Sequence, residues 1–325
     1  MKTHIRRAAC AAACSLLALP AAAAAHGRTA IRPTAIQRVS GHPHAAGSAS
    51  RRGIPELARR LHLSVGHAAS TTSHFNYPLG LATNAAGDVF VANYGSSEIN
   101  EITPTYAVPK TFKITQGLSG PISLATDAAG DIYAGNVNGG VQEYSASGSP
   151  IGQVTANAGD PSSIAADQFG DLYIAGAGAL AIDDPSGSSL YSSVQTARST
   201  TLVALGGAYV WSIQDGGASF GNGSVALRDG SLQFLEPSLP FTDPVGAACS
   251  ASDTCWITDG SKSVTAVAYD PVTDVFSSSG PISLPYVPAG IAYDAVHQRL
   301  YIADPVGEAV HVYNAKTLAL IRTIT

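Results

Sequence analysis

The chain has 325 residues, of which 45% are hydrophobic and only 13% are charged, and its formal net charge is −5. This length and hydrophobic content allow a large buried core, and the charged fraction is about half of the roughly 25% typical of soluble domains. Residues 74–325 carry eight Lys or Arg against twenty-two Asp or Glu. Because nucleic-acid binding needs clustered cations, this acidic balance argues against a nucleic-acid ligand.

The first twenty-five residues have the pattern of a signal peptide. Lys2, Arg6 and Arg7 form a positive start, residues 8–19 are apolar, and residues 23–25 offer a small-residue cleavage site. No other stretch approaches the roughly 18 apolar residues of a membrane span. We therefore expect a protein without a transmembrane segment that is exported to a periplasmic or extracellular location.

Residues 26–73 differ in composition from everything after them. They contain seven Arg, no Lys and one Glu, and they show no strand-like alternation. This composition predicts a basic, disordered linker or propeptide. The alternative is a short helix over residues 54–63, in which Leu57, Leu61 and Val65 share one face. The His residues dotted along the segment fit no metal-ligand spacing.

From residue 74 to the C-terminus the chain repeats one unit six times. Each unit has a short apolar strand, commonly opened by Pro, then a tight turn and a second strand with one aromatic residue. The copies span residues 78–93, 121–136, 161–176, 201–212, 244–259 and 288–304. Their expected anchors are Phe90, Tyr133, Tyr173, Tyr209, Trp256 and Tyr301. A period of about 40 residues made only of strands predicts an all-β propeller with six blades.

The order of residues within a unit explains how a blade forms. The first strand is small and apolar, as close packing around a central channel requires. Asn84, Asp127 or Asp167 then opens a turn with its own side chain, and a Gly in the left-handed region closes it. Two further strands complete each copy, which predicts four-stranded antiparallel blades.

Two blades depart from this pattern. Copy four loses three residues and the Asp-x-x-Gly turn at Leu205, and copy six lacks the turn Gly after Asp294. The last strand, over residues 318–323, completes blade six in sequence, so the ring is expected to close by packing between blades one and six. The alternative is that residues 61–65 add an edge strand that locks the ring.

The unit P-x-[GS]-[LI]-A-x-[DN]-x-x-G-D-[LIV]-[YF]-[VI]-A-[ND] resembles the NHL repeat. Six-bladed propellers related to it include bacterial streptogramin lyases and gluconolactonase-like lactonases. The resemblance covers residues 74–325 and implies the fold rather than a reaction. It also implies that the loops before each first strand and after each second strand form the binding face.

A set of polar residues falls on that face. The third residue after each expected aromatic anchor is Asn93, Asn136, Gly176, Ser212, Asp259 and Asp304, and Asp160 and Asp243 precede blade prolines. Oxygen ligands from Asn and Asp suit Ca²⁺ or another divalent cation, and the set resembles the polar ring of lactonase-like propellers. The alternative is structural, because Asn and Asp at such positions hydrogen-bond loop backbone.

The residues needed for catalysis are scarce. His74, His297 and His311 are the propeller histidines, none is expected beside a Glu on the binding face, and no G-x-S-x-G nucleophile motif occurs. We therefore predict a non-catalytic, monomeric binding propeller for a protein, peptide or glycan, with no catalytic residue and no cofactor. The alternative is a metal-dependent lactonase or lyase using Asn93, Asn136, Asp259 and Asp304.

The cysteines support the expectation of export. Only Cys249 and Cys255 follow the signal-like segment, and alignment on the repeat places them on opposite arms of one hairpin. In an oxidising compartment such a pair predicts a disulfide. Two free thiols or two metal ligands are the alternatives, although a structural zinc normally takes four ligands.

Overall fold

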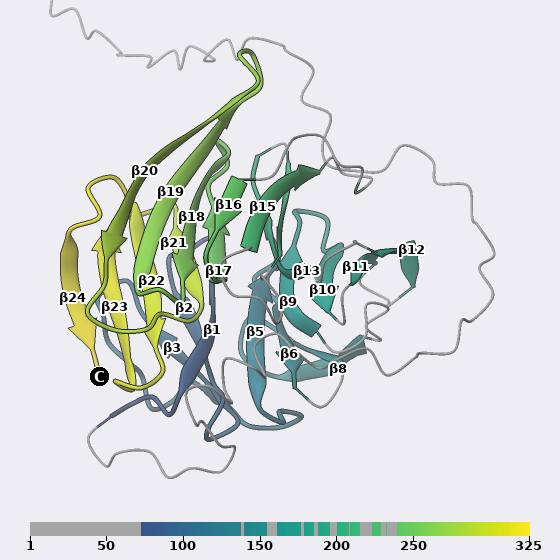
Figure 1. The fold of residues 1–325 in the computed structure, drawn as a ribbon. Coiled ribbons are helices and arrows are strands. Elements are labelled where there is room, and N and C mark those ends of the chain that lie inside the picture. Colours follow the sequence, from purple (N-terminus) through teal and green to yellow (C-terminus); the bar gives the residue numbers. More distant parts are fainter. Residues whose placement is uncertain are drawn as a thin grey trace, which may run out of the picture.

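The computed structural model describes residues 73–137, 140–154, 161–176, 179–184, 188–195, 200–207, 209–214, 223–228, 232 and 239–325. These residues form six four-stranded antiparallel sheets arranged in a ring, without a helix (Figure 1). The predicted six-bladed propeller is therefore confirmed. The signal-like segment, the basic segment and its alternative helix lie outside the described residues, and so does Asp160.

Each of the first three blades is built from consecutive strands. Blade one contains β1 (Pro78–Thr83), β2 (Val89–Asn93), β3 (Glu98–Ile102) and β4 (Lys113–Ile114). Blade two contains β5 (Pro121–Thr126), β6 (Ile132–Asn136), β7 (Val141–Tyr144) and β8 (Pro150–Val154). Blade three contains β9 (Pro161–Ala166), β10 (Leu172–Gly176), β11 (Ala179–Asp183) and β12 (Ser189–Gln195).

The other three blades follow the same order. Blade four contains β13 (Thr200–Leu205), β14 (Val210–Gln214), β15 (Gly223–Arg228) and β16 (Leu239–Phe241). Blade five contains β17 (Pro244–Cys249), β18 (Thr254–Asp259), β19 (Ser263–Asp270) and β20 (Val275–Ser283). Blade six contains β21 (Ile291–Asp294), β22 (Arg299–Asp304), β23 (Ala309–Asn314) and β24 (Leu320–Ile324).

The first strands come close to one another around the channel. A Cβ atom on Gly80 would lie 2.8 Å from the Cα of Ser123 in the next blade, a separation that real Cβ atoms do not adopt. Hydroxyl groups also link neighbouring blades. Thr126 donates to the carbonyl of Thr83 at 2.7 Å, and Thr258 donates to the carbonyl of Ala289 at 2.9 Å. Small residues are thus required where the blades converge.

The turns between first and second strands have the predicted chemistry. In blade one, the Asn84 side chain accepts hydrogen bonds from the backbone N–H groups of Ala86 and Asp88, each at 3.0 Å. Gly87 closes the turn at φ +86°, where a Cβ would cause strain. In blade six, Gln298 takes a positive φ of 55° instead of a Gly, which explains why the Gly signal is missing there.

One aromatic anchor was assigned wrongly. Phe90, Tyr133, Tyr173, Trp256 and Tyr301 are buried as expected. In blade four, however, Trp211 and not Tyr209 faces Ala204, as Phe90 faces Ala82 in blade one. The blade-four turn is one residue shorter than that of blade one rather than three, because Leu205 pairs with Val210 whereas Thr83 pairs with Val89.

Blades one and six close the ring by packing. Phe75 and Leu79 share a buried cluster with Tyr301, Val310 and Ile324. Hydrogen bonds cross the same boundary: Gly290 N–H donates to the carbonyl of Leu79 at 2.9 Å, and the Thr83 hydroxyl donates to the carbonyl of Tyr293 at 2.9 Å. Strand β24 completes blade six in sequence, as predicted. The alternative edge strand at 61–65 lies outside the described residues.

The disulfide prediction is confirmed. Cys249 on β17 and Cys255 on β18 face each other directly in the strand register, with their Cα atoms 4.0 Å apart, and their sulfurs are bonded. The alternatives of free thiols or metal ligands are therefore wrong. A stable disulfide is typical of proteins in oxidising compartments.

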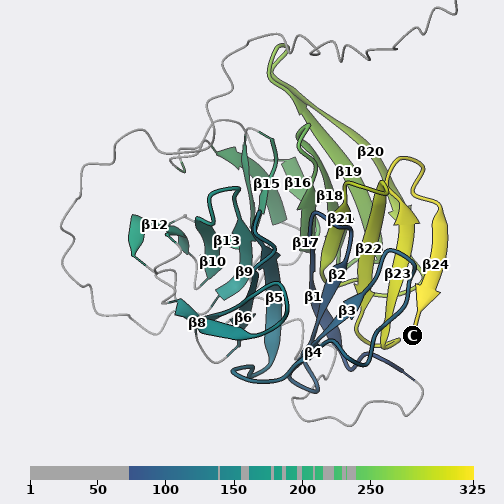
Figure 2. The ribbon, with the colours of Figure 1, turned by 180° about the vertical axis from the view of Figure 1, so that it is seen from behind.

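The third and fourth strands of blade five form a long hairpin. Strands β19 and β20 have eight and nine residues, whereas the strands of blade one have two to six. Their tip projects beyond the other blades in both ribbon views (Figure 1, Figure 2). The hairpin's inner side is covered, because Phe276 packs on Tyr269 and Trp211 with ring centroids 5.2 Å and 6.0 Å apart.

Candidate functional site

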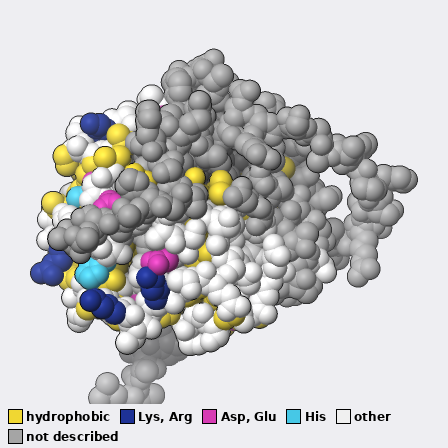
Figure 3. All heavy atoms as spheres, turned by 90° about the horizontal axis from the view of Figure 1, so that it is seen from below, with side chains coloured by type: hydrophobic (Ala, Val, Ile, Leu, Met, Phe, Trp, Pro, Cys, Tyr) yellow, Lys and Arg dark blue, Asp and Glu magenta, His cyan; other side chains and the backbone are white. Residues whose placement is uncertain are grey.

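The two faces of the propeller differ in the segments that form them. We call the loop face the side on which first strands begin and second strands end, as at Pro78, which pairs with Asn93. The turn face is the opposite side, where the turns at residues 84–88 and 295–298 lie. Figure 3 shows the molecule from below the view of Figure 1. On the described part of this surface, charged side chains of both signs occur singly rather than in one patch.

Asn93 is fully buried and holds a loop-face segment in place. Its side-chain oxygen accepts a hydrogen bond from the backbone N–H of Asn76 at 3.0 Å. Its amide nitrogen donates to the side-chain oxygen of Asn100 at 2.7 Å. Asn136 makes the equivalent contacts in blade two, accepting from the backbone N–H of Ser119 at 2.9 Å and donating to the carbonyl of Gly117 at 3.3 Å.

Asp259 organises the loops of blade five in the same way. One carboxylate oxygen accepts from the backbone N–H groups of Thr242 and Asp243 at 3.1 Å and 2.9 Å, and the other accepts from Ser261 N–H at 2.8 Å. Asp243 contacts the Asp259 carboxylate with its backbone N–H, and the backbone carbonyl of Asp243 accepts a hydrogen bond from Gly260 N–H at 2.8 Å. Asp259 is only 3% exposed, so its oxygens face protein donors rather than solvent.

Asp304 is the one ring carboxylate that also meets a titratable side chain among the described residues. Its first oxygen accepts from Gly307 N–H at 2.9 Å, and its second lies 3.3 Å from Nε2 of His311 on the adjacent strand β23. The other ring nitrogen of His311 lies 2.9 Å from the hydroxyl of Thr323. The ring of Tyr286 stacks on the imidazole, with centroids 4.1 Å apart.

Sequence reasoning assigned His311 no role, but the strand register could have done so. Asp304 pairs with Ala309 across the short β22–β23 connection, and residues diagonal to each other across two strands lie on the same side of a sheet. His311, two residues beyond Ala309, therefore reaches the Asp304 carboxylate. Tyr286 and Tyr313 lie beside this pair, with their hydroxyls 3.1 Å apart, and burial raises the pKa of both phenols.

The remaining positions of the ring contribute less. Gly176 pairs with Pro161 and has no side chain. Ser212 does not occupy the ring, because the corrected anchor places Gln214 there, opposite Thr200. Within the described part of the chain, no hydrogen bond joins any two of Asn93, Asn136, Asp259 and Asp304. Nor do the described residues include a group of three or more His, Cys, Asp or Glu that could hold a metal ion.

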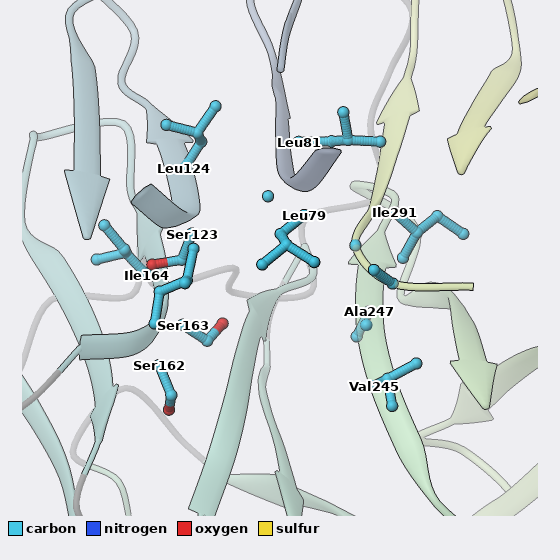
Figure 4. Close-up of a pocket in the computed structure, with 15 residues that line it drawn as sticks. Leu79, Leu81, Ser123, Leu124, Ser162, Ser163, Ile164, Val245, Ala247 and Ile291 are labelled. Atoms are coloured by element: carbon cyan, nitrogen blue, oxygen red, sulfur yellow. The ribbon is translucent and has the colours of Figure 1, made fainter. Parts of the chain in front are cut away.

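The central channel is narrow, and its lining side chains are mainly aliphatic, with three serines and three glycines. A cavity of about 60 Å³ lies between the first strands of blades one, two, three, five and six (Figure 4), enough for a few water molecules. Two of its serines serve the scaffold: Ser162 donates to the carbonyl of Ala175 at 2.9 Å, and Ser163 donates to the carbonyl of Val203 in blade four at 3.3 Å. Ser163 thus links blades three and four, and the channel leaves little room for a ligand.

Comparison with solved structures places this architecture among known propellers. The chain superposes on hydrazine synthase from Kuenenia stuttgartiensis with a TM-score of 0.58 and 15% identity, over 79% of this chain and 90% of the other. For a streptogramin B lyase the TM-score is 0.56 at 12% identity, over 78% and 84%. For the PQQ-bound aldose sugar dehydrogenase from Streptomyces coelicolor it is 0.54 at 14% identity, over 75% and 93%.

These proteins share the propeller fold with this chain. At such low identity the likeness extends to the fold alone. No family model matches the sequence, and no curated protein matches it either. The expected resemblance to streptogramin-lyase propellers is therefore confirmed for the architecture, while the NHL repeat itself stays a prediction.

No helix in the described residues is long and apolar enough to cross a membrane.

Proposed function

We propose that this protein is an exported, non-catalytic propeller that binds a protein, peptide or glycan ligand on its loop face. The main support is the state of the predicted ring. The four side chains are each 7% exposed or less, and their oxygens accept hydrogen bonds from backbone N–H groups of neighbouring loops. They are Asn93, Asn136, Asp259 and Asp304. Side chains occupied in this way shape loops rather than meet a substrate.

Two exposed valines in blade six allow a direct test of which face binds. Val306 lies between β22 and β23 on the loop face and is 62% exposed, and Val296 lies between β21 and β22 on the turn face and is 58% exposed. Ligands should be selected with a glycan array and a random-peptide display library. We expect Val306→Asp to weaken binding of a selected ligand at least tenfold and Val296→Asp to leave it unchanged. Equal sensitivity to both changes, or no selected ligand, would contradict the proposal.

The second candidate is a metal-dependent lactonase or lyase. One observation favours it: the pairing of Asp304 with His311 supplies an acid–base pair that the sequence did not predict. The fold is also compatible, since a lyase and a dehydrogenase are among its structural neighbours. The residues that would hold a cation are Asn93, Asn136, Asp259 and Asp304, once freed from their loop contacts.

Calorimetric titration with Ca²⁺, Mg²⁺, Mn²⁺ and Zn²⁺ separates the two candidates. If the protein is a non-catalytic binding propeller, we expect no cation to bind with micromolar affinity. The metal-dependent candidate requires micromolar affinity that is lost in Asp259→Ala and in Asp304→Ala. Asp270→Ala, which changes an exposed carboxylate at the end of β19, is the matched control and should have no effect.

A further inference from the structure

The outer strand of blade five, β20, is the longest outer strand in the described part of the chain, with nine residues. Strand β20 is the last strand of its sheet in the described part of the chain, and most of its side chains are exposed. An edge strand carries unpaired backbone donors and acceptors, which charged residues normally protect from pairing. Residues 275–283 contain no charge, and neither do the shorter outer strands β8, β12 and β16, whereas those of blades one and six carry Lys113 and Arg322.

Only part of this edge is regular enough to pair. The register of β20 against β19 is continuous from Val275 to Ser279 and is then interrupted at Gly280 and Pro281. Proline has no N–H to donate, so it ends a ladder. The free edge is therefore the five-residue segment 275–279, and Ser277 is its centre.

The charges of the hairpin are separated along its length. Asp270 and Asp274 flank the tip, and no charge occurs between Asp270 and Lys262 at the base of β19. Lys262 lies beside the end of β20, because its carbonyl accepts a hydrogen bond from Leu284 N–H at 2.7 Å. The hairpin thus has an acidic tip and a basic base.

We propose that a second copy of this chain pairs with this edge, β20 against β20 in antiparallel orientation about a two-fold axis at Ser277. In that arrangement Asp274 lies opposite residue 280 of the other copy and points toward its Lys262 end, which lies beside Leu284. The charge pattern is therefore self-complementary at long range rather than through close ion pairs. An isologous contact of this kind uses the same patch on both subunits. The long hairpin was not expected from the sequence, and the prediction of a monomer did not consider it.

The contact is small, so the dimer should be weak. Five paired residues and two tips bury less than the roughly 1,200 Å² of a stable interface. We expect reversible association of the full chain with a dissociation constant of roughly tens to hundreds of micromolar in sedimentation velocity at low salt. Salt should weaken the association, because the exposed charge pairs are screened.

Charge exchange tests the orientation. Lys262→Glu places like charges together at both ends and should weaken the dimer about tenfold. The double variant Lys262→Glu with Asp274→Lys should restore it, because both pairs return with reversed sign. Sedimentation as a monomer at millimolar concentration, or no recovery in a folded double variant, would overturn the proposal.

Cross-linking tests the axis. In the full chain with Cys10→Ser and Cys14→Ser, the substitution Ser277→Cys places a thiol opposite its own copy across the axis and should give an intermolecular disulfide on mild oxidation. Ile151→Cys, at another exposed position on outer strand β8, is the control and should not. Equal cross-linking of the two variants, or none of the Ser277→Cys variant, would refute the pairing. A monomer that captures extended peptides through β20 would refute it as well.

Discussion

At the scale of single residues, local hydrogen-bonding chemistry explains most of the positions that the sequence singled out. Asn84 turns the chain with its own side chain, and Asn93 and Asp259 hold loops through backbone donors. Such contacts span few residues, so they can be predicted from a motif. Contacts between strands cannot be read in this way, which is why His311 was overlooked.

The corrected anchor of blade four leads to a prediction about stability. Trp211 is fully buried and packs among Ile213, Leu227 and Ile257, whereas Tyr209 is only partly buried at the edge of the same cluster. Trp211→Ala should lower the free energy of unfolding by about 3–5 kcal/mol, the usual cost of removing a buried large aromatic residue. Tyr209→Ala should cost clearly less. Denaturant unfolding measures both, and a larger loss for Tyr209→Ala would restore the original assignment.

At the scale of strands and hairpins, prediction succeeded where each repeat carries its own signal. Turns between first and second strands are marked by Asn, Asp or Ser at their first position in every blade except the fourth, and the strands on either side follow from the period. Blade four lacks that marker at Gly206, so its register could not be fixed from sequence alone. The length of the β19–β20 hairpin was not predicted. The repeated unit covers only the first and second strands of each blade, so it says nothing about the length of the third and fourth.

The disulfide of blade five flanks a turn that Ser250 opens and Asp253 closes with a positive φ, where blades two and three have an Asp-x-x-Gly turn. Cys249 and Cys255 are six residues apart, so the closed loop is small and the entropy removed from the unfolded chain is modest, about 2 kcal/mol. Reduction should lower the free energy of unfolding by that amount and shift the denaturation midpoint. A Cys249→Ala, Cys255→Ala variant should show no response to the reductant. In a Cys10→Ser, Cys14→Ser background, free thiols in the unfolded, unreduced protein would contradict the pairing.

At the scale of the whole molecule, the ring depends on contacts between its first and last blades. Tyr106 in the β3–β4 connection lies between two cations of blade six: the guanidinium carbons of Arg299 and Arg322 are 4.8 Å and 5.0 Å from its ring centroid. Arg299 also donates to the carbonyl of Pro104 at 3.0 Å. We call Tyr106, Arg299 and Arg322 the closure clasp.

Removing the aromatic ring from the closure clasp should loosen the boundary between blades one and six. Each exposed cation–π contact contributes about 0.5–1 kcal/mol, so Tyr106→Leu should cost about 1–2 kcal/mol. Tyr106→Phe keeps the ring and should cost less. Hydrogen exchange should rise first in β1 and β21, which meet at this boundary. If Tyr106→Leu and Tyr106→Phe lower the free energy of unfolding equally, the aromatic ring contributes only apolar contact and no cation–π attraction.

In this ring, no described blade takes a strand from another part of the chain, and this affects how the blades can be connected. Every described blade is completed by consecutive strands, and Phe75 and Ile324, near the two ends of the described body, share one buried cluster. The ends of the described body therefore lie close enough to be joined by a short linker, and no described blade needs residues from another part of the chain. New ends between any two blades would leave all six sheets intact, so the fold has no obligatory starting point. The present order of the blades is then one of several circular permutations that the same packing can accommodate.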